Sequence, residues 1–251
     1  MASPSMTQAQ DETYLCGLIP EHNDAKFVSQ HLSAYAYLRR WAAGKRVMEI
    51  GFGEGYGANY LAEVASEVIA FDVTPGNIPR AKEKYTKPNL QFRLSDGVCY
   101  DVPDASIDLL GSFQVIEHIP ERHIPTYLKE LRRVLKPDGF ACITTLNLDN
   151  AMKPGEPYEK LRFHEKEFTG PELEQLLKQH FPAVEMNGLY LSPKHHLFQR
   201  LKKWGLLRWG PPSLNPVARF YENVTVDHFT VRRGVKPYAL DLIAVCRPTA
   251  P

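Results

Sequence analysis

Four glycines at alternate positions, directly after a short apolar strand, constrain this chain more than any other feature. Residues 47–57 read Val-Met-Glu-Ile-Gly-Phe-Gly-Glu-Gly-Tyr-Gly, and residues 58–64 continue as the start of a helix. Glycines in such a loop let the backbone turn tightly and approach a ligand closely, because no Cβ intervenes. A turn of this kind between a strand and a helix is where parallel α/β sheets bind nucleotide-like ligands. The glycines alone are weak evidence for a ligand site. Glu49, an acidic residue at the end of the strand, limits the kinds of ligand that would fit there.

The composition predicts one domain that spans residues 1–251. Hydrophobic residues make up 43% of the chain, which suits a single large core. Basic and acidic residues number 30 and 29, so no global charge favours nucleic acid as a partner. The four cysteines are widely spaced, and the N-terminus lacks a basic start followed by an apolar block. No apolar run reaches the roughly 18 residues of a spanning helix, so we expect a cytoplasmic protein without a transmembrane segment.

Strand and helix patterns alternate along most of the chain. A polar tail (1–23) and an amphipathic helix (24–44) precede seven short apolar strands, which are separated by helical or turn segments: 46–50, 67–72, 90–94, 106–113, 140–146, 184–191 and 238–246. This alternation predicts a doubly wound, mainly parallel α/β sheet. The long interval at 192–237, before the last strand, predicts an insertion that acts as a lid over the acceptor.

Acidic residues stand at the ends of the first three predicted strands. Glu49 could reach a positively charged ligand group, and Asp72 could accept hydrogen bonds from both hydroxyls of a ribose. Asp96 could accept from the exocyclic amine of a purine. Three carboxylates disfavour a phosphate and indicate a nucleoside that carries positive charge. The alternative interpretation is that these residues only cap strands and turns.

These residues, with Ile116-Glu117-His118 and the stretch Arg133–Gly139, resemble class I S-adenosylmethionine-dependent methyltransferases over residues 27–191 and the last strand. The resemblance implies a Rossmann-like seven-stranded sheet with an antiparallel last strand, and S-adenosyl-L-methionine as the cofactor. It implies that Glu49 lies near the methionine amine, Asp72 on the ribose and Asp96 near the adenine. The full set of cofactor-binding residues that we expect is Glu49, Gly51, Phe52, Gly53, Gly55, Asp72, Val73, Asp96, Gly97 and Gln114.

The segment after the fourth predicted strand carries the candidates for chemistry. Gln114, Glu117 and His118 are spaced i, i+3 and i+4, so they share a face on a helical turn, and His164 comes later. This spacing is similar to the metal-binding pattern of ubiquinone-pathway O-methyltransferases and small-RNA terminal 2′-O-methyltransferases, which hold a divalent cation. Gln114 replaces the first acid of that pattern, and a neutral amide is a poorer ligand for a hard cation. Two hypotheses stay open: a divalent metal at Glu117, His118 and His164, or a metal-free general base at His118 or His164.

Two further segments bear on the acceptor. Residues 163–169 resemble a segment of methyltransferases that act on bacterial surface polysaccharides and glycolipids, which implies a sugar hydroxyl. Residues 194–209 interleave basic and apolar side chains and predict a helix. Its apolar face would pack on the domain, lie on an anionic membrane surface or contact a phosphate-bearing acceptor. Residues 220–231 alternate enough to predict an extra strand.

Several functions compete at this point. The leading hypothesis is O-methylation of a hydroxyl on a small-molecule or glycan acceptor by in-line transfer. An RNA 2′-O-methyltransferase would need a basic groove, which a net charge of +1 does not favour. A non-catalytic cofactor-binding partner subunit is the third hypothesis, and formation of a methylated product separates it from the others. The acid before the glycine loop disfavours a nicotinamide-dependent oxidoreductase.

Overall fold

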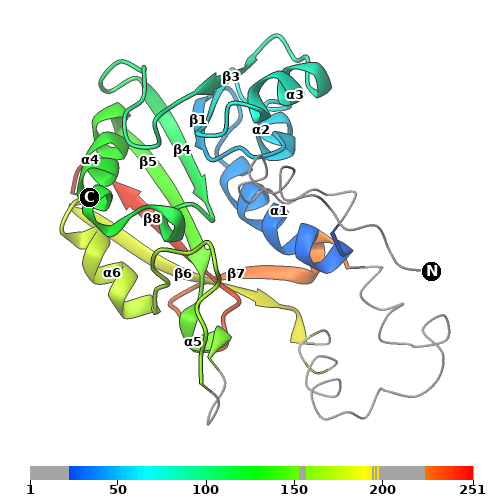
Figure 1. Cartoon of the computed structure of the whole chain (residues 1–251), viewed down its shortest axis with the longest axis vertical. Helices are drawn as coiled ribbons and strands as arrows, with labels where there is room; N and C mark the ends of the chain where they lie inside the picture. Colours follow the sequence, from blue (N-terminus) through cyan, green and yellow to red (C-terminus); the bar gives the residue numbers. More distant parts are fainter. Residues whose placement is uncertain (1–22, 153–156, 194, 196, 198–223, 251) are drawn as a thin grey trace, which may run out of the picture.

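In the computed structural model, which describes residues 23–152, 157–193, 195, 197 and 224–250, eight strands form one open sheet with helices on both faces (Figure 1). The strand order is β3-β2-β1-β4-β5-β8-β6-β7. The strands are β1 (Arg46–Ile50), β2 (Glu67–Asp72), β3 (Leu90–Leu94), β4 (Ile107–Phe113), β5 (Leu135–Leu146), β6 (Ala183–Leu191), β7 (Phe229–Arg233) and β8 (Asp241–Arg247). The first five strands run parallel, whereas β8 is antiparallel to both of its neighbours, β5 and β6.

The predicted Rossmann-like fold with an antiparallel last strand is confirmed, but the described sheet has eight strands rather than seven. The additional strand is β7, which pairs antiparallel with β6 at the sheet edge. The alternation over 220–231 indicated such a strand, yet β7 begins only at Phe229 because residues 226–228 form a 3-10 turn capped by Thr225. Almost all of the predicted helix at 194–209 and of the tail at 1–23 lies outside the described residues, so the lid stays a prediction.

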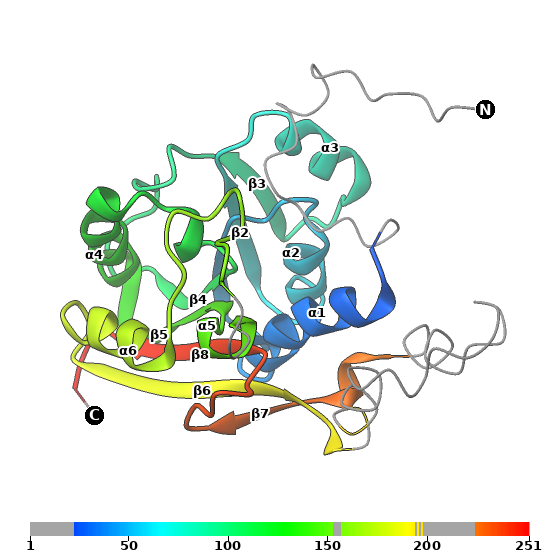
Figure 2. The ribbon, with the colours of Figure 1, turned by 60° about the horizontal axis from the view of Figure 1, so that its bottom comes forward.

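The helices divide between the two faces of the sheet, as Figure 2 shows. One face is covered by α1 (Ala25–Arg39), α2 (Tyr56–Leu61) and α3 (Asn77–Lys84), and the other by α4 (Ile124–Val134) and α6 (Gly170–Lys178). Side chains alternate along β1, so Val47 and Glu49 point towards α1 while Met48 and Ile50 join the core under α4. The strand therefore buries one carboxylate, that of Glu49, against the first helix.

Residues 136–139 lie inside β5, where they form a bulge. The pairing of β4 with β5 passes from Ile107↔Leu135 directly to Leu109↔Phe140. A Cβ on Gly139 would lie 2.6 Å from the carbonyl oxygen of Asp108, so only glycine fits this close approach of the two strands. A short helix, α5 (Leu148–Ala151), follows β5. Within the described part of the chain, no helix is both long enough and apolar enough to cross a membrane.

Candidate active site

The glycine loop between β1 and α2 depends on left-handed backbone conformations. The φ angles of Gly51, Gly53 and Gly55 are 73°, 54° and 84°, which other residues rarely adopt. A Cβ on Gly51 would lie 2.6 Å from Cγ2 of Val115, in the segment that follows β4. The amide of Gly53 donates to Oδ2 of Asp72 at 2.8 Å, which anchors the loop on the end of β2.

A cavity of about 380 Å³, here called the first cavity, opens beside this loop. Its wall includes His118 and five of the predicted cofactor residues: Gly51, Asp72, Val73, Asp96 and Gly97. Hydrogen bonds from the backbone amides of Val98 and Cys99 hold the pKa of Asp96 below its ordinary value, so this carboxylate is ionised at neutral pH. The other predicted cofactor residues, which are Glu49, Phe52, Gly53, Gly55 and Gln114, do not line this cavity.

Glu49 lies buried behind the glycine loop. The hydroxyl of Tyr35 donates to its Oε1 at 2.6 Å, whereas its Oε2 has no hydrogen-bond partner among the described residues. Burial raises the pKa of Glu49 to about 8. The nearby charge of Asp72 also raises this pKa, whereas the hydrogen bond from Tyr35 lowers it. A buried oxygen without a partner is costly, so Glu49 is suited to receive a cationic or hydrogen-bond-donating group.

The three predicted catalytic residues meet beyond the end of β4. Glu117 and His118 belong to a 3-10 turn (Ile116–His118), and His164 lies in the segment before α6. Their ligand-capable atoms all lie within 4.8 Å of one another. The two imidazole rings meet edge to face with 4.8 Å between their centroids. The structure thus brings together Glu117, His118 and His164, but not Gln114, of the pattern described above.

Hydrogen bonds orient both imidazoles through the same ring nitrogen. Nδ1 of His118 lies 2.9 Å from the carbonyl oxygen of Phe163, and Nδ1 of His164 lies 2.6 Å from Oε1 of Glu167. A carbonyl and an ionised carboxylate can only accept, so Nδ1 carries the proton and Nε2 is left for a ligand. Burial lowers the pKa of His118, against the hydrogen bond to Phe163, so this ring is neutral at pH 7. Burial opposes ionisation of Glu167, but the hydrogen bonds that it accepts outweigh this effect and lower its pKa.

Glu117 is fully buried, and neither of its carboxylate oxygens makes a hydrogen bond of good geometry with any described residue. Burial raises its pKa to about 8, and the carboxylates of Asp241 and Glu167 act in the same direction. The backbone amide of Glu117 and the hydroxyl of Thr145 act against this rise. Leaving such a group unsatisfied costs roughly 1–3 kcal/mol or more, so this carboxylate also indicates a ligand.

A cavity of about 360 Å³, here called the second cavity, lies on the other side of the histidine pair. Its wall includes polar side chains from α1, from the ends of β4 and β5, from the segment before α6 and from β8: Gln30, His31, Gln114, Asn147, His164 and Asp241. His118 lines the first cavity and His164 lines the second, and their rings are in contact. The histidine pair therefore lies between the two cavities.

Gln114 departs from the predicted helical turn. Its φ of 55° is left-handed, which is uncommon for any residue except glycine, and the 3-10 turn begins only at Ile116. Gln114 lines the second cavity together with His164, whereas His118 lines the first. The predicted helical face shared by Gln114, Glu117 and His118 is therefore wrong, although the last two do lie together.

Sequence analysis missed Gln30, His31 and Asp241. Nε2 of Gln30 donates to both carboxylate oxygens of Asp241, at 3.0 and 3.1 Å. Burial raises the pKa of Asp241 to about 6, against the effects of Gln30 and Lys26, and burial lowers the pKa of His31 to about 4. Gln30 and Asp241 are separated by 211 positions, so no local motif marks them. The one available signal was a lone carboxylate at the start of the apolar strand β8.

Comparisons with known proteins identify the family. Residues 48–143 match a family described as a methyltransferase domain. A probable S-adenosylmethionine-dependent methyltransferase of Mycolicibacterium smegmatis is 33% identical over 177 residues, which cover 70% of this chain and 66% of that protein. A phthiotriol/phenolphthiotriol dimycocerosates methyltransferase of Mycobacterium leprae is 28% identical over 149 residues, which cover 59% and 51%. The chain thus matches about half to two thirds of the length of these curated relatives.

Solved structures resemble the same fold. The structure described as a DhpI–SAH complex superposes with a TM-score of 0.54 and 17% identity, over 87% of this chain and 83% of that one. At this identity the likeness shows the fold alone. Together with the matched family and the sheet order, it leads to one conclusion. The chain belongs to the class I S-adenosylmethionine-dependent methyltransferases.

Proposed function

We propose that this chain transfers the methyl group of S-adenosylmethionine to a hydroxyl of a small-molecule or glycan acceptor. The position of the contacting His118–His164 pair between two cavities carries the proposal. The first cavity would hold the cofactor and the second the acceptor. In-line methyl transfer depends mainly on positioning, and two cavities that meet at one polar pair provide it.

The residues around the first cavity fit the cofactor. Asp72 and Asp96 in the cavity wall would accept from the ribose and the adenine. Glu49 does not line the cavity but lies behind the glycine loop, where its unpartnered Oε2 would receive the cationic methionine amine. The bound cofactor supplies an activated methyl group on a sulfonium. The chain itself would bind and orient it, with the glycine loop in close contact.

We further infer that Glu117, His118 and His164 would hold a divalent cation, which would polarise the acceptor hydroxyl. Imidazoles whose other N–H is fixed by a carbonyl or a carboxylate are typical of metal sites. Two nitrogen donors and one carboxylate suit manganese, iron or zinc better than magnesium. General-base catalysis by His118 alone would leave both oxygens of Glu117 without a partner, so the metal explains more of the site.

The proposal is tested with the full chain and S-adenosylmethionine labelled on its methyl group. The acceptor panel contains sugars, glycolipids and, because one relative is named for such acceptors, phthiotriol-type lipids. We expect labelled product and S-adenosylhomocysteine. His164→Ala should lower turnover by about 100-fold or more, the scale of lost acid–base or metal assistance, and leave the affinity for S-adenosylhomocysteine within about twofold. His180→Ala is the control, because His180 lines neither cavity.

Three other results would contradict the proposal. If neither nucleoside binds, the cofactor assignment is wrong. If both bind but no acceptor on the panel or in a cell extract becomes labelled, the chain is better described as a cofactor-binding partner subunit. Activity on RNA with none on glycans or lipids would favour the 2′-O-methyltransferase hypothesis instead.

Asp72→Asn tests the placement of the ribose. We expect the binding of S-adenosylhomocysteine to weaken by about 1–3 kcal/mol, the scale of a lost hydrogen bond to a charged group, as measured by calorimetry. Asp72 also accepts from the amides of Gly53 and Thr74, so the melting temperature must be measured on the same sample. Asp138→Asn, on the exposed bulge of β5, is the matched control. Unchanged affinity in the Asp72 variant would place the ribose elsewhere.

A further inference from the structure

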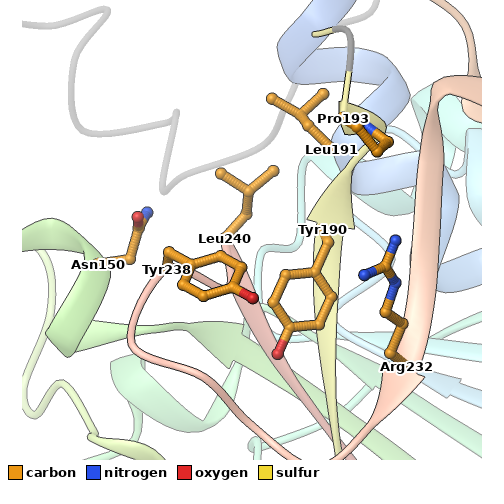
Figure 3. Close-up of a pocket in the computed structure, with 7 residues that line it drawn as sticks. All are labelled: Asn150, Tyr190, Leu191, Pro193, Arg232, Tyr238 and Leu240. Carbon is orange, nitrogen blue, oxygen red and sulfur yellow. The ribbon is translucent and has the colours of Figure 1, made fainter. Parts of the chain in front are cut away.

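A third cavity adjoins the proposed acceptor cavity (Figure 3). It has a volume of about 310 Å³ and is lined by Asn150, Tyr190, Leu191, Pro193, Arg232, Tyr238 and Leu240. Asn150 and Leu240 also line the second cavity, so the two cavities meet at these residues. The wall comes mainly from β6, β7 and the loop before β8, at the edge of the sheet that β7 extends.

Tyr190 forms a fixed aromatic wall of this third cavity. Its hydroxyl accepts from the amide of Lys236 at 2.9 Å and donates to the carbonyl of Gly234 at 3.3 Å, so the ring cannot move freely. Tyr238 stands beside it with 5.4 Å between ring centroids, and 53% of its surface is exposed. Figure 3 shows the two rings next to each other. The cavity therefore offers a ligand one rigid and one accessible aromatic ring.

Arg232 adds a positive charge to the same wall. Its guanidinium carbon lies 5.6 Å from the centroid of the Tyr190 ring. The neighbouring Arg233 pairs with Glu185, whereas no ion pair involves Arg232 in the part of the chain that the structure describes. A guanidinium stacked on an aromatic ring keeps its N–H fork free for a carboxylate or a phosphate.

We propose that the third cavity binds a sugar ring that carries a negative charge, as part of the acceptor. An aromatic face packs against the apolar C–H face of a pyranose, the amide of Asn150 suits its hydroxyls, and Arg232 suits its anion. A purely apolar chain would leave the guanidinium without a role. The link to the methylated hydroxyl rests on the proposed function, because it requires the second cavity to hold the acceptor, but binding of the charged sugar does not.

Binding experiments with the full chain, without cofactor, test this assignment. The probes are glucose 1-phosphate, a disaccharide that ends in glucuronate, the neutral disaccharide cellobiose, and inorganic phosphate, measured by saturation-transfer NMR and calorimetry. We expect at least one charged sugar to bind about tenfold or more tightly than cellobiose. If only glucose 1-phosphate or only the glucuronate disaccharide binds, the proposal is supported and the result identifies the charged group as a phosphate or a carboxylate. Equal binding of charged and neutral sugars, or of glucose 1-phosphate and inorganic phosphate, would overturn it.

Neighbouring residues provide a matched pair of variants. Arg232→Ala should remove the preference for charged sugars. Tyr238→Ala should weaken the binding of all the sugars, charged and neutral, by about tenfold. Arg233→Ala removes the adjacent charge, which does not line the cavity. It should change neither the affinity for sugars nor the preference for charged ones. Equal losses in both arginine variants would show a nonspecific charge effect and overturn the assignment.

Titration of the same samples with S-adenosylhomocysteine separates this inference from the proposed function. If S-adenosylhomocysteine binds normally but charged and neutral sugars bind equally well, only the charged-sugar site is contradicted. If charged sugars bind more tightly than neutral ones but S-adenosylhomocysteine does not bind, only the proposed methyl transfer is contradicted.

Discussion

Replacing Glu117 by glutamine is expected to abolish binding of Mn²⁺ and to lower methyl transfer by about 100-fold or more. A neutral amide is a poor ligand in place of the buried carboxylate, and a Lewis acid supplies several kcal/mol of stabilisation, at about 1.4 kcal/mol for each factor of ten in rate. The variant should fold, because the change keeps the side chain's size and burial already disfavours the ionised form of Glu117. Calorimetric titration with Mn²⁺ and a methyl-transfer assay with and without chelator measure both effects.

The matched control is Glu121→Gln. Glu121 lies four residues further along, is exposed and pairs with Lys166, so this variant should bind Mn²⁺ and turn over like the unchanged protein. Full activity of Glu117→Gln in the presence of chelator would exclude a metal at this site and return His118 to the role of general base.

Replacing Glu49 by glutamine is expected to flatten the pH dependence of stability in the cofactor-free protein. The pKa of Glu49 is about 8 in the folded state and near 4.5 in the unfolded state, so the folded state binds the extra proton between these values. Its contribution to stability is present at low pH and is lost as pH rises towards 8, by about 1 kcal/mol per pH unit. Over pH 5–8 the free energy of unfolding of the unchanged protein should therefore fall by a few kcal/mol more than that of the variant.

Urea unfolding at several pH values measures this difference. Glu117 and Asp241 also have raised pKa values, so only the comparison between the unchanged protein and the variant isolates Glu49. Glu63→Gln is the control, because Glu63 is a half-exposed partner of Arg39 and should leave the pH profile unchanged. Parallel profiles for Glu49→Gln and the unchanged protein would show that Glu49 is ionised without its ligand. The same variant should also weaken cofactor binding, because its side chain no longer offers a negative charge to the amine.

The grouping of the predicted cofactor residues Gly51, Asp72 and Asp96 could be anticipated from the sequence because each lies at the end of a short strand. Gly51, Asp72 and Asp96 each follow a short apolar strand, and parallel neighbouring strands bring their ends to one edge of a sheet. The three residues then line one cavity. Glu117 and His118 are adjacent in sequence, so only His164 had to be inferred from a resemblance.

The surroundings of the second cavity could not be predicted in the same way. Asp241 comes near α1 only because β8 runs antiparallel between β5 and β6, a pairing that no local pattern in β8 reveals. The backbone of Gln114 is left-handed, which helical spacing does not anticipate. Edge strand β7 has only five residues and follows a 3-10 turn. Its short pattern of alternating side chains therefore does not determine how it pairs with β6. Long-range pairing decides each of these features.

The position of β8 between β5 and β6 also has a consequence for the order in which the sheet is assembled. β8 pairs with β5 and with β6, so the sheet is completed only when residues 241–247 have been made. During synthesis β1 to β5 are made well before β8. Asp241, Leu240 and Tyr238 reach their places afterwards. A nascent chain that stops before residue 238 would therefore leave the facing edges of β5 and β6 without the strand that joins them.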